Sequence, residues 1–362
     1  MSTTKNRWHQ LRAQRALREW KIELPKRHSK RTVCAIFFTT GLQFLLCYLS
    51  THMSLLNIII MAYIVGAFLC VYIFSNCHEI CHNLVHPFFS NKTAKNILLR
   101  FASLPDISSG NYFYYKWGHI SHHRFLGEHS IDEIIEGAYE RPLDLDPITH
   151  LRNMYLFRNE KDGTPVYRFE KIRDNKWLRA IVLFGMPVID TLKLPMLVPS
   201  RIKLLIQMEK SGRSTERIKD ALSQDFIVLL SFFIMYLIFG NFNFLLYLYA
   251  SHLFYKGFMH PYLFLWVGIH KSGKNDEDGY QPTSSIYAKF SGFLSGGINY
   301  HIEHHDFPGI PRNQLRKVNK KIPQLYNKCF SFKSYREIIN YLKRDIYDHS
   351  YHLPLEEKST AS

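Results

Sequence analysis

The chain has 362 residues, of which 46% are hydrophobic and 15% aromatic, and its formal net charge is +16. The hydrophobic residues are clustered in long runs, so the near-neutral mean hydropathy does not indicate a soluble protein. The sequence contains no nucleic-acid-binding motif, and beside apolar runs the positive charge favours anionic lipid headgroups or an acidic soluble partner. Six cysteines without paired spacing argue against a disulfide framework and favour a reduced, cytosol-facing site.

The first 32 residues form a basic segment in which we expect an amphipathic, surface-lying helix at 7–20 and no cleavable signal sequence. A transit peptide is the competing interpretation. Glu19, Glu23 and the direct run into an apolar segment argue against it.

Four apolar runs predict four membrane-spanning helices in two hairpins, at about 33–50, 55–75, 226–240 and 242–269. A bilayer core needs about 20 apolar residues per helix, so the third run is somewhat short and the fourth could tilt or project. Basic residues crowd the N-terminus, the loop 80–222 and the C-terminal region. The positive-inside rule therefore places both termini and that loop in the cytosol.

The segment 177–208 mixes apolar residues with charges and three prolines. We interpret it as an interfacial or re-entrant helix; the alternative, a fifth span, would move everything after it to the other side. The predicted fold is therefore all-α, with a cytosolic helical cap. We expect a basic N-terminal segment (1–32), a membrane domain (33–325) and a C-terminal cytosolic helix and tail (326–362).

Three histidine clusters have the spacing of metal ligands: His78-Glu79-Ile80-Cys81-His82, His119-Ile120-Ser121-His122-His123 and His301-Ile302-Glu303-His304-His305. Residues three and four apart share a helix face, so each cluster can direct two or three imidazoles to one point. Since one metal rarely takes more than about five histidines, eight predict a two-metal site of iron, zinc, copper or nickel. The predicted topology places all three clusters on one side of the membrane. The candidate ligands are His78, His82, His119, His122, His123, His301, His304 and His305.

These clusters resemble the histidine boxes of the membrane fatty acid desaturase and hydroxylase superfamily. The first box reads H-E-I-C-H-N, the second G-H-I-S-H-H and the third N-Y-H-I-E-H-H-D-F-P-G-I-P. The third is the most specific, because Asn299-Tyr300 and Asp306-Phe307-Pro308 also look like the acyl-lipid and sphingolipid desaturase branch. The resemblance covers roughly residues 35–325. Spacing alone indicates only a multi-histidine metal site.

The resemblance implies a non-haem di-iron enzyme that uses O2 and introduces a double bond into the acyl chain of a fatty acid or lipid. The sequence has no H-P-G-G haem motif and no flavin or nicotinamide fingerprint. Electrons are therefore expected from a separate cytochrome b5-like or ferredoxin-like carrier. The implied location is a bacterial inner membrane or the endoplasmic reticulum. The stretch R-F-L-G-E-H-S-I-D-E after the second box departs from the common pattern and leaves the substrate headgroup open.

The family often adds a histidine upstream of the third box, and His270 has about the right separation. His252 and His260 compete with it. They share a helix face with Lys256, but hydrogen-bonded core histidines are the simpler interpretation of both.

Carboxylates commonly orient metal-bound imidazoles, and Glu79 and Glu303 inside the boxes are candidates for this role, together with Asp132 and Asp306. An ordinary surface acid is the simpler interpretation of each. Asn299 could hold a metal-bound water or form a structural turn.

Three alternatives remain from the sequence. A lipid hydroxylase of the same superfamily would share the boxes. A zinc intramembrane protease would use His78-Glu79-x-x-His82 with Glu79 as general base, but five box histidines would then have no role. A metal-binding protein or transporter without catalysis would not need such strict box flanks.

Overall fold

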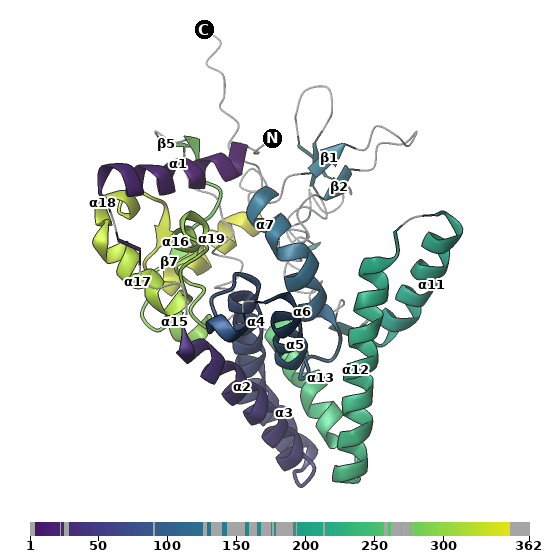
Figure 1. Ribbon diagram of the computed structural model, residues 1–362. Helices are drawn as coiled ribbons and strands as arrows, with labels where there is room; N and C mark the ends of the chain where they lie inside the picture. The colour runs from purple at the N-terminus through teal and green to yellow at the C-terminus, as the bar shows by residue number, and fades with distance from the viewer. Residues whose placement is uncertain are drawn as a thin grey trace.

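The computed structural model describes residues 4–21, 23–24, 29–89, 91–125, 129–131, 140–142, 156–158, 165–167, 175, 177–178, 191–192, 194–212, 214–256, 260–261, 269, 275–276 and 279–347. These residues are mostly helical. Apolar hairpins form the lower half of the molecule in Figure 1, and a cap of shorter helices forms the upper half.

Among the described residues, three helical stretches are long and apolar enough to cross a membrane: α2 (Lys30–Ser50), the continuous stretch Leu55–Cys81, and α12 (Glu216–Phe239). The second consists of α3 (Leu55–Met61), a π-helical turn η1 (Ala62–Gly66) and α4 (Ala67–Cys81). Its helix continues past the predicted end at 75, so it carries part of the first box. The third begins at Glu216 rather than 226.

The predicted fourth span at 242–269 is not confirmed. Helix α13 (Asn243–Lys256) covers its first half, whereas residues 257–259 and 262–268 lie outside the described residues. Helix α12 ends at Gly240, whose φ of 74° is a left-handed conformation that glycine adopts without steric cost. The chain then turns back into α13.

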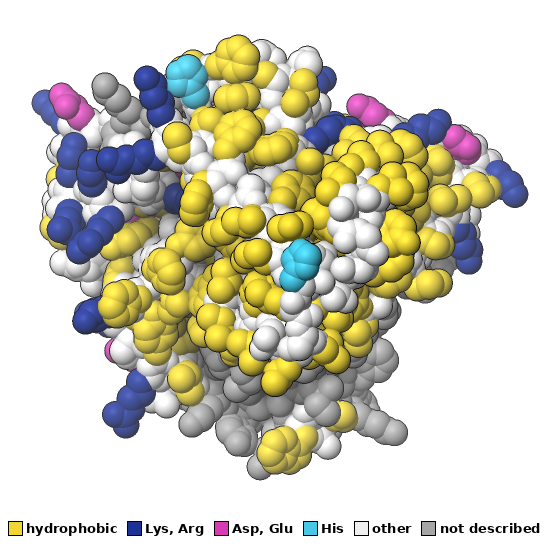
Figure 2. Space-filling model, turned by 90° about the horizontal axis from the view of Figure 1, so that it is seen from below, with side chains coloured by type: hydrophobic (Ala, Val, Ile, Leu, Met, Phe, Trp, Pro, Cys, Tyr) yellow, Lys and Arg dark blue, Asp and Glu magenta, His cyan; other side chains and the backbone are white. Residues whose placement is uncertain are grey.

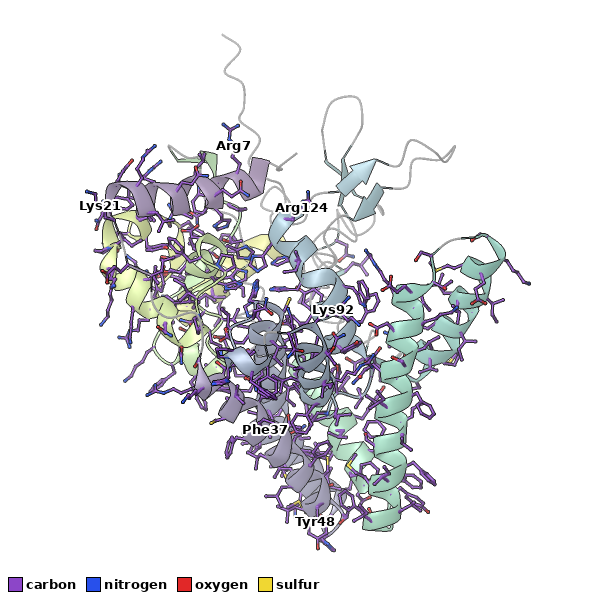
Figure 3. The ribbon with its side chains drawn as sticks, viewed as in Figure 1. Arg7, Lys21, Phe37, Tyr48, Lys92 and Arg124 are labelled. Carbon is purple, nitrogen blue, oxygen red and sulfur yellow. The ribbon has the colours of Figure 1, made fainter. Side chains whose placement is uncertain are left out.

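The lower half of the molecule exposes a broad apolar surface. Figure 2 shows this face from below, with most of the visible basic side chains toward its edges. On α2 and α12 large side chains point outward, including Phe38, 66% exposed, and Ile238, 70% exposed. Soluble monomers rarely expose contiguous apolar patches of this extent. Figure 3 labels Phe37 and Tyr48 on this half and the basic residues Arg7, Lys21 and Arg124 on the cap.

Helix α13 packs inside the hairpins, against η1, α4 and α2. Its Tyr247 hydroxyl donates to Gln43 Oε1 of α2 over 3.1 Å. Gly66 makes the closest approach, since a Cβ atom at that position would overlap the Ser251 hydroxyl. A glycine in η1 therefore lets two apolar helices come together, as small residues commonly do in membranes.

The cap surrounds the upper ends of the hairpins (Figure 1). Its N-terminal helix α1 (Thr4–Glu19) lies across the helix of the third box, burying Trp8 and Ala16. The predicted amphipathic helix at 7–20 therefore packs on protein. The other helical elements outside the hairpins are η2 (Pro87–Phe89), α5 (Lys92–Ala102), α6 (Gly110–Phe113), π-helical η3 (Tyr114–Gly118), α7 (His119–Phe125), η4 (Leu194–Met196), α11 (Leu197–Lys210), α15 (Ser291–Leu294), α16 (His301–Asp306), α17 (Arg312–Lys321), α18 (Pro323–Tyr326) and α19 (Tyr335–Tyr347).

In the part of the chain that the structure describes, four short strand pairs accompany the helices. The all-α prediction did not include them. Three are antiparallel: β1 (His129–Ile131) with β2 (Glu140–Pro142), β3 (Leu156–Arg158) with β4 (Pro165–Tyr167), and β5 (Asn275–Asp276) with β6 (Gly279–Tyr280). The fourth is parallel and joins β7 (Ser285–Ile286) to β8 (Ser331–Phe332). It ties the segment before the third box to the chain that follows α18.

Candidate metal centre

Three helical elements carry the histidine boxes to one place at the upper ends of the hairpins. His78 lies in the last turn of α4, and His82 follows as its C-terminal cap. The predicted span had ended at 75, before His78. The second box forms α7, directly after the π-helical turn η3, and the third box forms α16. A π-helical turn adds a residue and thereby changes which side chains face the neighbouring elements.

Five histidines form the first group: His78, His82, His119, His123 and His304, whose candidate ligand atoms all lie within 4.8 Å of one another. Their Nε2 atoms form a continuous series. His78 to His304 is 2.9 Å, His304 to His123 3.0 Å, His123 to His119 3.1 Å and His119 to His82 3.0 Å. We call this set the five-histidine group.

The other three box histidines, His122, His301 and His305, form a second group within the same 4.8 Å limit. The Nε2 atoms of His301 and His305 are 3.1 Å apart. The ring of His305 also lies 4.2 Å, between centroids, from that of His123 in the first group. This three-histidine group and the five-histidine group therefore adjoin.

The donor set fits bound metal ions. Each imidazole nitrogen offers either one proton or one lone pair, so a nitrogen such as His304 Nε2, with two imidazole neighbours, cannot be satisfied by ordinary paired hydrogen bonds. Metal–imidazole bonds are about 2.0–2.1 Å, so two ligands at a right angle are about 3 Å apart and two tetrahedral ligands about 3.4 Å. The observed spacings of 2.9–3.1 Å match the right-angle arrangement. Imidazole is a suitable ligand for iron.

The electrostatics favour the neutral, metal-binding form of these rings. Burial, followed by the neighbouring histidines, holds the pKa values of His119, His123 and His304 well below their usual range. Burial and the nearby Lys95 lower the pKa of His82 to about 3. Neutral imidazoles present lone pairs, whereas protonated ones cannot bind a cation.

Tyr114 supports the first group from behind. Its hydroxyl lies 2.9 Å from His119 Nδ1, the nitrogen that does not face the other histidines. Such a contact fixes the tautomer and ring orientation of a metal-binding histidine. Sequence reasoning missed Tyr114, because a tyrosine five residues before a box has no distinctive signal.

The carboxylates expected to orient imidazoles bond elsewhere in the described part of the chain. Glu79, which is 1% exposed, accepts the backbone N–H of Arg312 at 3.1 Å and the Thr32 hydroxyl at 3.4 Å. It thereby joins the first box to α17 and α2. Asp132 lies outside the described residues.

Glu303 accepts hydrogen bonds from the hydroxyls of Ser285 at 2.7 Å and Tyr287 at 2.6 Å, and from Asn319. It anchors the third box to β7 and α17. Asp306 bonds to His9 and Arg12 of α1. Neither His9 nor Arg12 was singled out from the sequence. The available signal was a basic amphipathic segment in which Trp8, His9 and Arg12 have near-helical spacing.

The remaining candidates are placed as follows. His270 lies outside the described residues. His252 pairs with Asp106 at 3.2 Å, and His260 packs against the rings of Tyr63 and Phe68; within the described residues neither belongs to either group. The Asn299 side chain donates to Ile286 O and Ser291 Oγ, which supports a turn before the third box.

Comparisons with known proteins show which family the sequence resembles. A family model described as fatty acid desaturase matches residues 54–335. The chain is 26% identical to "Sphingolipid delta(4)-desaturase DES1-like" of Oryza sativa subsp. japonica (79% of this chain, 70% of that protein). Its identity to the Arabidopsis thaliana protein of the same description is also 26% (78% and 69%). To the "Putative sphingolipid delta(4)-desaturase/C4-monooxygenase" of Caenorhabditis elegans it is 24% (82% and 67%). No solved structure matches the chain significantly.

Proposed function

Because this chain belongs to the fatty acid desaturase family, we propose that it is a membrane di-iron enzyme that introduces a double bond into the acyl chain of a lipid. The observation that carries the proposal is the convergence of all eight box histidines in two adjoining groups at the end of a candidate membrane span. Its oxidant is O2, and its electrons come from a separate carrier.

Iron supplies, when bound, the oxidising power that removes hydrogen from an unactivated alkyl chain, which no side chain possesses. The overall reaction balances: the lipid gives up two hydrogen atoms, a donor supplies two electrons, and two protons with these convert O2 into two waters. The five-histidine group would hold one iron and the three-histidine group the other. His270 remains a predicted further ligand.

The protein's own residues hold and shield the site. Buried, neutral imidazoles keep the ligand lone pairs available without proton release. Tyr114 fixes the tautomer of His119, so that Nε2 faces the group. Phe74, one turn before His78, packs its ring 5.0 Å from that of Tyr115, and both are buried. Tyr115 in turn packs edge-on against the rings of His78 and His119, so an aromatic layer lies beside these two histidines.

The substrate we propose is a long-chain lipid, and specifically one of the sphingolipid type. His78 lies in the last turn of the apolar stretch Leu55–Cys81, so an alkyl chain within the membrane has a short path to the histidines. The sphingolipid class is supported by the descriptions of the rice, Arabidopsis and nematode relatives.

A lipid hydroxylase is the second candidate, since the nematode relative's description includes a C4-monooxygenase. In that reaction one oxygen atom enters the lipid and the other leaves as water. The protease alternative has less support: Glu79, its general base, is buried and bonded to Thr32 and Arg312.

We propose that the cap and both termini face the cytosol, in the endoplasmic reticulum or a bacterial inner membrane. The exposed side of α17 carries Arg316, Lys317, Lys320 and Lys321. A basic surface on the cap suits an acidic, cytochrome b5-like or ferredoxin-like electron carrier.

Lipid mass spectrometry of cells expressing the protein tests the proposal. Lipids lighter by two hydrogen atoms identify a desaturase, and lipids heavier by one oxygen atom identify a hydroxylase. Cells expressing His304→Ala are the control and should show neither change. An unchanged lipid profile in cells that supply iron, O2 and a donor would contradict both candidates.

A Glu79→Gln variant separates the oxidoreductase from the protease. The amide keeps the size of the side chain. Its oxygen can accept from the Arg312 backbone N–H, and its NH2 group can donate to the Thr32 hydroxyl, so a di-iron enzyme should retain its metal and part of its activity. A zinc protease would lose its base and its turnover.

A further inference from the structure

Helix α1 precedes residues 54–335, the segment matched by the family model, yet it lies directly over the third box. In Figure 1 it runs along the upper edge of the cap, above α16 and α18. Three of its residues, Trp8, His9 and Arg12, are nearly fully buried. We call these three residues the α1 clasp.

The clasp holds Asp306, the residue immediately after the candidate ligand His305. His9 Nδ1 lies 2.6 Å from Asp306 Oδ1, and Arg12 Nε lies 3.3 Å from Oδ2. Both carboxylate oxygens are therefore occupied from one helix. All three groups are buried, and hydrogen bonds to an ionised carboxylate are stronger than those between neutral groups. The end of α16 is fixed as a result.

His9 also contacts the ligand ring itself. Its ring stacks on that of His305, with centroids 5.0 Å apart and planes 29° from parallel. Its Nε2 lies 3.2 Å from the Thr283 hydroxyl. The carboxylate of Asp306 only accepts, so in the neutral ring Nδ1 donates to Asp306 and Nε2 accepts from Thr283. Both nitrogens are then used, which makes His9 a support for His305 rather than a metal ligand.

The rest of the clasp fixes α1 in place. Trp8 is 1% exposed and packs in an apolar cluster with Ile302 of the third box and Tyr326 of α18. The Arg12 guanidinium lies over the Trp8 ring at 4.2 Å, and its Nη2 donates to the Leu325 carbonyl at 3.1 Å. The position of His9 is therefore set by contacts independent of the histidine groups.

We propose that His9 is a positioning residue, through which the α1 clasp holds His305 in the geometry that binds the metal of the three-histidine group. The inference rests on the proposed di-metal function. It predicts that disturbing His9 weakens one metal site and spares the other, because the ring on which His9 stacks belongs to the three-histidine group.

The test is a Co²⁺ titration of the full-length, detergent-purified, metal-free protein, monitored by visible absorption. The variants are His9→Leu, which removes both hydrogen bonds, and His9→Gln, which keeps a donor and an acceptor. Gln10→Leu is the matched control, because it introduces the same side chain at the neighbouring, exposed position. Melting temperature is measured for each.

We expect wild type and Gln10→Leu to bind two Co²⁺ per chain. We assign the second binding step to the three-histidine group. In His9→Leu this step should weaken roughly 10- to 100-fold, as is typical when a contact behind a metal ligand is removed. The first step should be unchanged, and His9→Gln should restore part of the loss. If His9→Leu does not fold, His9→Gln carries the test, with a smaller loss confined to the second step.

Two results would overturn the inference: equal binding of both metals in all His9 variants, or an equal loss at both steps together with a lowered melting temperature. The second would show a general structural role. If the wild-type protein itself binds fewer than two Co²⁺ per chain, the proposed di-metal function is wrong. Failure of that proposal is therefore distinguishable from failure of the inference about His9.

Discussion

Tyr114→Phe should weaken metal binding at the five-histidine group. With a metal on Nε2, a neutral His119 carries its proton on Nδ1, which donates to the Tyr114 oxygen 2.9 Å away. In the variant this N–H is buried without a partner. In the metal-free state, by contrast, His119 can move its proton to Nε2. The cost therefore falls on the metal-bound state.

A buried donor without a partner costs about 1–3 kcal/mol. At about 1.4 kcal/mol per factor of ten, this corresponds to a loss of about 5- to 150-fold in metal affinity. His119 and Tyr114 are 4% and 7% exposed, so water cannot readily replace the hydroxyl. The fold should be unaffected, because the ring remains.

The assay is a competition titration of Fe²⁺ against a chelator under anaerobic conditions, with desaturation rates measured in parallel. Tyr115→Phe is the matched control: its ring packs 5.2 Å from that of His119, but its hydroxyl does not bond to His119 Nδ1. The control should bind as wild type does. An affinity for Tyr114→Phe within twofold of wild type would refute the reasoning.

The two histidine groups can be separated by mutation: His122→Ala should remove iron from the three-histidine group and His304→Ala from the five-histidine group, each abolishing turnover while the protein still inserts. Full activity in either variant would remove that box from the site. Gly66→Ala should lower the melting temperature, because the added methyl group would overlap the Ser251 hydroxyl and overpacking costs about 1–3 kcal/mol. Gly41→Ala is the control, since the space around Gly41 is open and its melting temperature should not change. Equal melting temperatures would contradict this packing. In the metal-free protein, burial and a nearby lysine lower the pKa of His82 to about 3, so below about pH 6.5 the unfolded state binds more protons. The melting temperature should therefore fall as the pH drops from about 6.5 toward 3. A melting temperature that does not change over this pH range would contradict a neutral, buried site.

The features predictable from sequence are local ones. Apolar runs indicated α2 and the stretch beginning at Leu55, because burial in a bilayer core demands about 20 apolar residues in succession. The three- and four-residue spacing of the box histidines indicated that each box could direct its imidazoles to one point. The structure brings all eight together, since each box lies on a short helical element at the same end of the molecule.

The division into five and three could not be predicted. His122 and His123 are neighbours in sequence but belong to different groups, as do His304 and His305. Adjacent residues on a helix point about 100° apart, so the group that each one joins depends on how α7 and α16 approach each other. That packing is a contact between distant segments, so it cannot be predicted from the spacing of the histidines within each box.

Contacts between segments far apart in the chain could not be predicted from the sequence either. His9 and Asp306 meet across nearly the whole chain. Glu79 and Glu303 lie inside the boxes, yet their bonds hold α2, α17 and β7 in place. Their position within the boxes predicted that both glutamates lie near the histidines. Their hydrogen-bond partners, however, depend on the elements that pack beside the boxes.

Metal analysis of the detergent-purified wild-type protein tests the central claim most directly. The two adjoining histidine groups predict about two irons per chain, falling to about one or fewer in His304→Ala. One zinc per chain, without iron and with unchanged lipids in expressing cells, would contradict the assignment of these histidines to a di-iron desaturase.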